Sequence, residues 1–357
     1  MHLHDETARL IARMPKAELH VHLDGSLRPE TAFELARERG LADGISDVSA
    51  MRDRLVAPER CVDQTDLLRA FDLPIAIMQD RESIARITHE MVLDCASDGT
   101  RYVEIRWAPA LHLERGLTMR QSIGAVVDGA QSGMVAAALE QPPGIEVRLI
   151  AVALRSHDPE VSLAVAREAL AFVGRGLVGF DFAGREADFP DPGPHRAAFE
   201  LAREGGLGIT IHAGEWGGAA QVWRALSVEP SRIAHGAPAA DDPVLMGELR
   251  ARGVTLDLCP TSNVQAAIVS TLADHPLPYL LRSGVPVTLS TDDRTVSDLT
   301  LVREYERAHA VLGVTVPELW RMNLHALRVA FLHQEERARA GLMAELEAFA
   351  SAEGLPA

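Results

Sequence analysis

The chain has 357 residues, 47% of them hydrophobic, a formal net charge of −16 at pH 7, and three cysteines that form no CxxC pair. This length and apolar content suit one α/β barrel with a large core, while the acidic balance disfavours nucleic acids and anionic membranes as partners because both require basic surface. No apolar run approaches the roughly 20 residues of a membrane helix, the N-terminus lacks the basic start and apolar core of a signal peptide, and the unpaired cysteines are typical of a reduced, cytoplasmic protein.

Lysine is almost absent from the sequence. Lys16 is the only lysine, so nearly all of the 35 residues counted as Lys or Arg are arginine. A Schiff-base lysine, a phosphate-loop lysine or a carbamylated lysine bridging two metals would have to be Lys16, and its sequence context fits none of them. These chemistries are therefore excluded.

The first apolar, β-type run, Glu18–Leu23, carries two histidines. Successive side chains of a strand point to opposite faces, so His20 and His22 share one face and the apolar residues between them can pack on the other. Neutral imidazoles suit zinc, so the pair indicates either a metal site or two histidines on a half-buried strand. His2 and His4 have the same spacing but no strand pattern around them, and we expect them to be inert.

A long segment separates this strand from the next, Arg101–Ala108. Pro29 opens a predicted helix, Glu30–Gly40. One crossover helix cannot fill the remainder, so we expect inserted helices over approximately residues 45–95 that lie over the mouth of a barrel as a lid. Within them, Thr65–Phe71 begins like a capped helix. Its apolar residues belong either to a lid or to ordinary core: Leu67, Leu68 and Phe71.

Short β-type runs and helical patterns then alternate to the end of the chain, which is the signature of βα units. Further predicted strands are Glu146–Ala153, Leu177–Phe182, Gly208–Ala213, Arg232–His235, Val254–Leu258 and Pro286–Ser290. Predicted helices are Glu82–Cys95, Met119–Leu139, Glu160–Phe172, His195–Arg203, Ala219–Leu226, Pro243–Arg252, Asp298–Ala310, Val316–Phe331 and Glu335–Ala350. With the first two strands this makes eight, so we expect a TIM-type (β/α)8 barrel with a C-terminal helical extension, and one domain over residues 1–357.

Histidines and acids collect where the predicted strands end, which is where the chemistry of such a barrel lies. They are His20, His22 and Asp24 after the first strand, Asp181 with Gly184 at the fourth, His212 and Glu215 at the fifth, His235 at the sixth, and Asp292 and Asp293 at the eighth. Other histidines fall in loops or helices without evident partners, and we expect them to be structural: His112, His195, His275, His309, His325 and His333.

Three of these imidazoles and one carboxylate form a plausible metal set. His20, His22, His212 and Asp292 would hold one Zn²⁺ per chain and leave a position for water, whose pKa such a metal can lower to about 7. His235, one strand further round, could either take the proton of this water or steady the resulting hydroxide.

Two further carboxyl groups complete the predicted chemistry. Glu215 follows the strand that carries His212 and could donate a proton to a substrate nitrogen. Asp293 would point away from Asp292 if the chain stays extended there, which would free it to contact substrate. These parts suit hydrolytic attack on an electron-poor carbon bonded to nitrogen.

The residues at the strand ends resemble the adenosine deaminase family of metal-dependent amidohydrolase-like barrels. The matching pieces keep the family's order over roughly residues 15–330: ELHVHLDGSL, RYVEIRWAP, GFDFAGRE, HAGE, RIAHG, CPTSN and STDD. The resemblance implies a zinc-dependent hydrolase that converts adenosine or 2′-deoxyadenosine to the 6-oxopurine nucleoside and ammonia.

The resemblance also implies the role of each residue. It makes His20, His22, His212 and Asp292 the zinc ligands. It makes Glu215 the donor to purine N1, His235 the group that assists the attacking hydroxide, and Asp293 the partner of N7. The backbone N–H of Gly184 would bond N3, Asp24 would bond a ribose hydroxyl, and His22 would also face the substrate.

Two departures from the family pattern lie beside these motifs. Ser290 and Arg294 flank TDD where Asn and Pro are common, and the sixth motif has Ala in place of Gly before His235. Arg294 changes the loop next to the predicted metal. A related deaminase of another 6-aminopurine, such as aminodeoxyfutalosine or adenine, is therefore the main alternative, ahead of a phosphoesterase, a binuclear amidohydrolase or a non-catalytic purine-binding protein.

Overall fold

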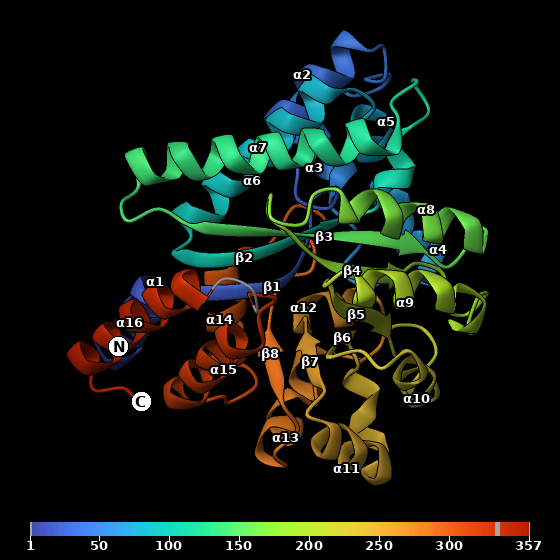
Figure 1. Cartoon of the computed structure of the whole chain (residues 1–357). Coiled ribbons are helices and arrows are strands. Elements are labelled where there is room, and N and C mark those ends of the chain that lie inside the picture. The colour runs from blue at the N-terminus through green and yellow to red at the C-terminus, as the bar shows by residue number, and fades with distance from the viewer. Residues whose placement is uncertain (1, 333–335, 357) are drawn as a thin grey trace.

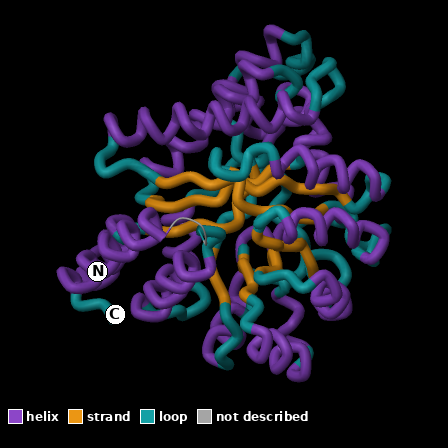
Figure 2. The backbone as a smooth tube through the Cα atoms, viewed as in Figure 1, coloured by secondary structure: helices purple, strands orange, loops and turns teal. Residues whose placement is uncertain are grey.

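Eight parallel strands follow one another in the order of the sequence. The computed structural model describes residues 2–332 and 336–356. Its strands are β1 (Lys16–His22), β2 (Thr100–Trp107), β3 (Glu146–Leu154), β4 (Leu177–Ala183), β5 (Gly208–Ala213), β6 (Arg232–His235), β7 (Thr255–Leu258) and β8 (Val287–Leu289). Each pairs in parallel with the next. The strands lie inside a ring of helices (Figures 1 and 2), which confirms the predicted (β/α)8 barrel.

The chain beyond β8 closes the ring against β1. Val21 forms a parallel bridge with Asp292. The Asp292 N–H donates to the His20 carbonyl at 3.0 Å, and the His22 N–H donates to the Asp292 carbonyl at 2.7 Å. The Oγ of Ser290 accepts from the N–H of His20 at 3.2 Å. Strand β1 and the chain after β8, which are far apart in the sequence, are therefore joined at the point where His20 and His22 lie.

The helices cover the outside of the barrel, and both termini lie on the same side of the molecule (Figure 1). They are α1 (His2–Arg13), α2 (Pro29–Glu38), α3 (Val48–Leu55), α4 (Gln64–Leu68), α5 (Asp72–Ile77), α6 (Arg81–Ser97), α7 (Met119–Glu140), α8 (Pro159–Leu170), α9 (Arg196–Glu204), α10 (Ala219–Ala225), α11 (Pro243–Arg252), α12 (Pro260–Gln265), α13 (Leu277–Arg282), α14 (Leu301–Ala310), α15 (Val316–Val329) and α16 (Glu336–Glu353). Several of them begin at a side-chain cap; for example, Thr118 and Gln121 form a capping box at α7.

Two predicted helix starts are wrong for local reasons. α14 begins at Leu301 rather than Asp298, because Thr300 caps the helix and Asp298 has a φ of +47°, outside the helical region. The short helix α4 is capped by Asp63, which accepts from the N–H of Asp66, and not by Thr65. In both helices the cap is the residue immediately before the first helical residue.

Helix α7 differs from the expectation that no segment is long and apolar enough to cross a membrane. By length and composition it qualifies, with 22 residues and a mean hydropathy of 1.2 in its best window, and 56% of that window is buried inside the protein. It packs closely on α6 through small residues: a Cβ at Gly129 would lie 2.4 Å from the Ala85 carbonyl oxygen, and one at Gly133 would lie 2.7 Å from Val92. The sequence predicts this helix as Met119–Leu139 but not its high mean hydropathy, because small residues and polar residues interrupt any continuous apolar run in it.

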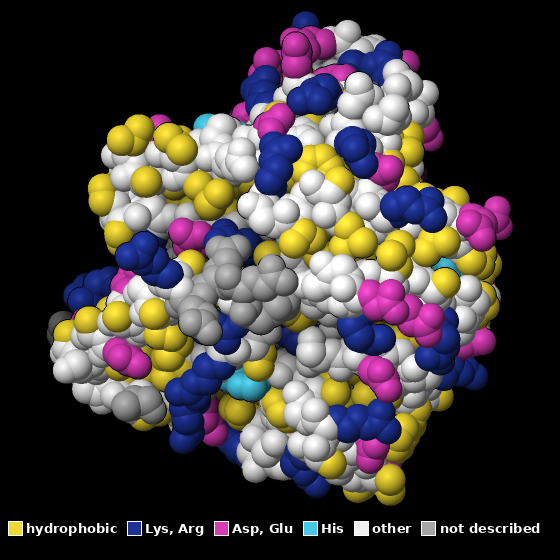
Figure 3. Space-filling view, in the orientation of Figure 1, with side chains coloured by type: hydrophobic (Ala, Val, Ile, Leu, Met, Phe, Trp, Pro, Cys, Tyr) yellow, Lys and Arg dark blue, Asp and Glu magenta, His cyan; other side chains and the backbone are white. Residues whose placement is uncertain are grey.

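Charged side chains fill the lower interior of the barrel, below the histidines. Arg232 on β6 pairs with Glu104 on β2, and its Nε donates to Asp257 on β7 at 3.1 Å. All three are fully buried, and the guanidinium of Arg232 faces both carboxylates, so neither acid is left without a cationic partner. On the outer face shown in Figure 3, basic and acidic side chains are interspersed.

Candidate active site and metal centre

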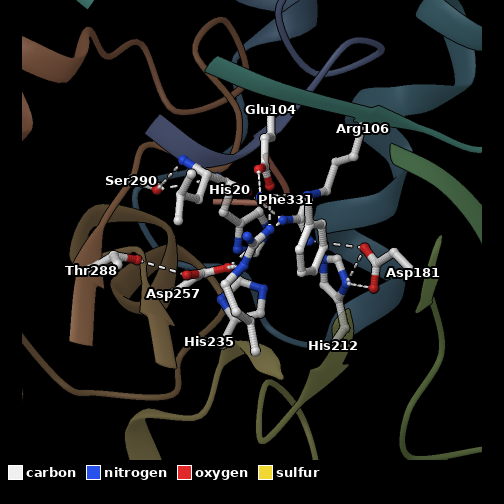
Figure 4. Close-up of polar contacts among 12 residues, drawn as sticks. His20, Glu104, Arg106, Asp181, His212, His235, Asp257, Thr288, Ser290 and Phe331 are labelled. Carbon is white, nitrogen blue, oxygen red and sulfur yellow. Dashed lines mark hydrogen bonds and ion pairs between the residues drawn. The ribbon is translucent and has the colours of Figure 1, made fainter. Parts of the chain in front are cut away.

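Four predicted ligands converge at the C-terminal end of the barrel. The Nε2 of His20 lies 2.9 Å from the Oδ1 of Asp292, and the Nε2 of His22 lies 3.4 Å from the same oxygen. The Nε2 of His22 also lies 3.2 Å from the Nε2 of His212. Strand alternation and the closure of the ring thus bring β1, β5 and the chain after β8 to one point, as Figure 4 shows for His20 and His212.

The spacing of these atoms fits a shared metal ion. Ligands about 2.0–2.1 Å from a tetrahedral ion lie about 3.3 Å from one another. The Nε2 of His20 is buried and, apart from its contact with Asp292, has no hydrogen-bond partner in the described part of the chain. Burial lowers the pKa of His20 well below its usual range and that of His22 to about 3, so both imidazoles are neutral, the form that binds metal.

A fifth side chain, His235, also lies within reach. Ligand atoms of His20, His212, His235 and Asp292 all fall within 4.8 Å of one another. The Nε2 of His235, however, lies 3.8 Å from the Oδ2 of Asp292. The imidazole of His20 faces the other oxygen of that carboxylate, Oδ1. His22 is therefore the better fourth ligand, and His235 stands beside the set.

The sequence predicts no role for the side chains that orient these ligands. Asp181 at the end of β4 lies 3.0 Å from the Nδ1 of His212, and Arg106 on β2 donates to Asp181 at 2.9 Å. Ser262 donates to the Oδ2 of Asp292 at 2.6 Å. Such outer partners fix the tautomer and direction of a ligand. The position of Asp181 at the end of a predicted strand indicates that it lies near the site. Only the structure shows that it contacts His212.

The chain turns sharply at Asp292. Its φ is +68°, in the left-handed region that non-glycine residues adopt rarely and often at functional sites. The prediction assumed an extended chain at Asp292, and that assumption is wrong. The turn at Asp292 separates the side chain of Asp293 from that of Asp292. A Cβ at Gly25 would lie 1.8 Å from the Oδ1 of Asp293, so only glycine fits beside it.

Three carboxyl groups face this region in a buried setting. Glu215 lies with one oxygen 3.9 Å from the Nε2 of His235, and its side chain is 12% exposed. Burial, with the nearby charges of Asp292 and Glu186, raises the pKa of Glu215 well above its usual value. Burial also raises the pKa of Asp293 well above its usual range and that of Asp24 to about 6. A carboxyl group in such a place keeps a proton that it can donate.

One side chain outside the prediction fixes the loop that carries Glu215. The oxygens of Glu186 accept from the backbone N–H groups of Gly214 at 2.8 Å, Trp216 at 2.7 Å and Gly217 at 3.0 Å. Both neighbours of Glu215 are tied to one carboxylate, so the backbone that presents Glu215 is held on each side.

Two buried carboxyl oxygens beside the site lack a hydrogen-bond partner within the described residues. The Oδ1 atoms of Asp24 and Asp293 are buried and make no hydrogen bond to any residue in the described ranges. Gly184, predicted to offer its backbone N–H, has a φ of +102°, and its carbonyl accepts from Gln64 on α4 at 3.1 Å. Buried polar groups are normally paired, so these groups indicate a polar ligand.

The helices inserted between β1 and β2 lie over this end of the barrel. Leu67 and Phe71 pack with residues beyond other strands, in an apolar cluster separate from the main core: Ala57, Cys61, Ala70, Trp216, Ala266, Ile268 and Val296. Trp216 follows β5, and Ala266 and Val296 follow β7 and β8. This packing is compatible with the lid hypothesis for Leu67 and Phe71, and the lid itself stays a prediction.

Arg294 does not project into the site. Its guanidinium lies 3.3 Å from Glu18 and 2.8 Å from Asp98, beneath the loop that carries Asp292. Cys259 is buried as a free thiol and lies 3.6 Å from the Nδ1 of His20, and burial raises its pKa well above the usual range. Lys16 lies at the opposite end of β1, where its Nζ donates to the Met14 carbonyl.

Known proteins match nearly the whole chain. A sequence profile described as adenosine deaminase matches residues 15–348. A curated adenosine deaminase from Clostridium perfringens is 35% identical over 327 residues, covering 91% of this chain and 96% of that protein. One from Mycobacterium ulcerans is 36% identical over 345 residues, covering 93% and 94%.

Solved structures of other proteins share the fold of this chain. Adenine deaminase from Arthrobacter aurescens is 29% identical, covers 95% of this chain and 99% of that one, and gives a TM-score of 0.83. The Arabidopsis N6-mAMP deaminase is 27% identical with coverages of 95% and 99% and a TM-score of 0.82. The match in sequence and in fold leads to one conclusion: this chain belongs to the adenosine deaminase family, a family of metal-dependent hydrolases of C–N bonds in cyclic amidines.

Proposed function

We propose that this protein is a zinc-dependent hydrolase that converts adenosine and 2′-deoxyadenosine to inosine and 2′-deoxyinosine with release of ammonia. The observation that carries this proposal is the convergence of the Nε2 atoms of His20, His22 and His212 and the Oδ1 of Asp292, beside the buried carboxyl of Glu215. The names of the relatives support the nucleoside as substrate.

Zinc is the metal that this donor set suits. Three imidazoles and one carboxylate with tetrahedral spacing are typical of Zn²⁺. When bound, this ion lowers the pKa of a coordinated water, so that a nucleophile is available near neutral pH. Asp181 contacts the ring of His212, and Ser262 donates to the Oδ2 of Asp292, so hydrogen bonds from the protein orient both donors.

The remaining groups bind the purine and move one proton. The raised pKa of Glu215 keeps its carboxyl protonated, so it can donate to purine N1 and make C6 electrophilic. The unpaired Oδ1 of Asp293 is available to N7 if that carboxyl and the ring share a proton, and Asp24 is available to a ribose hydroxyl. His235 has its Nε2 directed between Glu215 and Asp292, where it can assist the attacking oxygen.

A spectrophotometric assay tests the proposal. Zinc-loaded full-length protein is mixed with adenosine, and the fall in absorbance at about 265 nm and the release of ammonia are followed together. We expect efficient turnover of adenosine and 2′-deoxyadenosine, with kcat/KM in the common range of about 10⁴–10⁸ M⁻¹s⁻¹. No ammonia release from either nucleoside would contradict the proposal.

Another 6-aminopurine compound is the second candidate substrate. Adenine is a candidate because the adenine deaminase from Arthrobacter aurescens gives a TM-score of 0.83. Aminodeoxyfutalosine is a candidate because it carries the same reactive ring. The same assay with a panel of these compounds separates them. A kcat/KM for adenosine at least tenfold below that for either rival would replace adenosine as the substrate.

A further inference from the structure

His235 stands at the end of a buried chain of hydrogen bonds that runs away from the site. Its Nδ1 lies 3.0 Å from the Nδ2 of Asn263 on α12. The Oδ1 of Asn263 lies 3.0 Å from the Nε2 of His275. The Nδ1 of His275 accepts from the backbone N–H of Leu277 at 3.1 Å. His275 therefore has partners, contrary to the expectation from sequence, and all three side chains in this chain are buried.

The backbone N–H of Leu277 fixes the direction of every bond in the chain. A backbone N–H can only donate, so the Nδ1 of His275 is an acceptor and its ring proton is on Nε2. That N–H donates to the amide oxygen of Asn263, which leaves the amide NH₂ facing His235. The Nδ1 of His235 must therefore accept, and a neutral His235 carries its proton on Nε2.

No other arrangement satisfies this buried chain. A proton on the Nδ1 of His235 would face the amide N–H of Asn263. Rotating the amide by 180° would place its NH₂ against the N–H of His275, and shifting the proton of His275 would place it against the N–H of Leu277. Each alternative leaves two buried donors in opposition. Burial also lowers the pKa of His275 to about 3, in keeping with a neutral ring.

His212 is held in the opposite tautomer. Its Nδ1 faces the carboxylate of Asp181, which can only accept, so the proton is on Nδ1 and the Nε2 lone pair is free for a metal. His235 instead turns an N–H toward the site. That Nε2 is buried, lies 3.9 Å from Glu215 and 3.8 Å from Asp292, and makes no hydrogen bond to the residues described.

We propose that Asn263 and His275 are positioning residues that lock His235 as the Nε2–H tautomer. In this state His235 donates a hydrogen bond to the attacking oxygen, and it neither accepts a proton from that oxygen nor serves as a metal ligand. The part of this inference that concerns the reaction rests on the proposed function, whereas the tautomer of His235 does not.

Imidazole ¹⁵N–¹H spectra of the zinc-loaded full chain test the tautomer directly. The His235 signals are assigned by their loss in His235→Ala. We expect wild-type protein at pH 7 to show the proton of His235 on Nε2. In Asn263→Asp the carboxylate accepts from both rings, so we expect the proton to move to Nδ1. A wild-type spectrum with the proton on Nδ1, or on both nitrogens, would overturn the proposal.

Matched variants then test the role in catalysis. Asn263→Asp should lower kcat for adenosine by about 100-fold, the size of a lost transition-state hydrogen bond, and change KM less than about threefold. His275→Gln keeps an N–H for Asn263 and should stay within about fivefold of wild-type kcat, whereas His275→Leu, which has no donor, should fall at least tenfold below it.

A purely structural role predicts a different pattern. It would make His275→Gln and His275→Leu lose thermal stability, zinc content and kcat together, and that result would contradict the proposal. Near-normal kcat in an Asn263→Asp variant whose tautomer is reversed would contradict it as well. If wild-type protein turns over no aminopurine, the proposed function fails while the spectra still report whether the lock exists.

Discussion

Glu215 occupies a position in which a carboxyl group can hold a proton near neutral pH. It is buried next to Asp292, and the carboxylate of Glu186 fixes the backbone on both sides of it. Neither of its oxygens is among the atoms that face the proposed ion, so its chemistry is separable from metal binding. A proton donor of this kind acts mainly in the transition state.

We therefore expect Glu215→Gln to keep one zinc per chain while kcat for adenosine falls by about 10³-fold or more, since the amide cannot transfer a proton. Elemental analysis and steady-state kinetics on the same preparation check this. Glu200→Gln on the exposed face of α9 is the control and should be indistinguishable from wild type. Turnover within tenfold of wild type in Glu215→Gln would remove this residue from the mechanism.

The proposed metal ligands could be predicted from the sequence, whereas the side chains that orient these ligands could not. His20, His22, His212 and Asp292 follow strands, and the topology of a parallel barrel gathers strand ends at one rim. Asp181 also ends a strand, but whether it meets His212 or the substrate depends on side-chain direction and on Arg106 beneath it. Local sequence carries no information on such pairings.

The short helix α4 and the turn after it, Arg69–Phe71, belong to the predicted lid and contact the rim of the barrel. Gln64 donates to the Gly184 carbonyl, and Leu67 packs in the apolar cluster over the rim. A five-residue helix is not stable alone, so its cap contributes a large share of its local stability. Asp63 supplies that cap through the N–H of Asp66 at 2.9 Å.

Removing this cap should loosen the lid without disturbing the chemistry. Loss of an N-cap costs about 1 kcal/mol, which corresponds to a change of about fivefold in the closed population, so we expect Asp63→Ala to raise KM for adenosine by up to about fivefold with kcat little changed. Thr315→Ala, which removes the cap of the distant helix α15, should lower Tm and leave KM unchanged. Equal KM values for the two variants would refute a lid role for α4.

Element boundaries were predicted well where turn chemistry is local. β5, β6 and α11 begin and end as the sequence indicates, because Gly208, Pro243 and similar residues mark their starts. β1 begins at Lys16, two residues earlier than predicted, because it pairs there with Thr100 of β2. That pairing joins residues more than eighty positions apart, and no local pattern reports it.

At the scale of the molecule, the two ends of the barrel have different chemistry. The histidines and carboxyl groups lie at one end of β1, and the only lysine lies at the other, buried with its Nζ on the carbonyls of Met14 and Ala12. Burial lowers the pKa of Lys16 from 10.5 to about 8. Between these values the unfolded chain binds more protons than the folded one, so the contribution of Lys16 makes unfolding harder as pH rises.

This linkage predicts a difference between wild type and Lys16→Met. From pH 8 to pH 10.5 the free energy of unfolding of wild type should rise, relative to that of the variant, by about 2–3 kcal/mol. Denaturant unfolding of both proteins at several pH values in this range measures the difference. A constant difference across the range would show that Lys16 keeps an ordinary pKa in the folded state.

Zinc content per chain, measured by elemental analysis after dialysis of wild type, His212→Ala and His235→Ala against the same buffer, tests the account most directly. The convergence of three imidazoles and Asp292 predicts one zinc per chain in wild type, none retained in His212→Ala, and one per chain in His235→Ala. Two zinc ions per wild-type chain, or loss of zinc from His235→Ala as complete as that from His212→Ala, would contradict it.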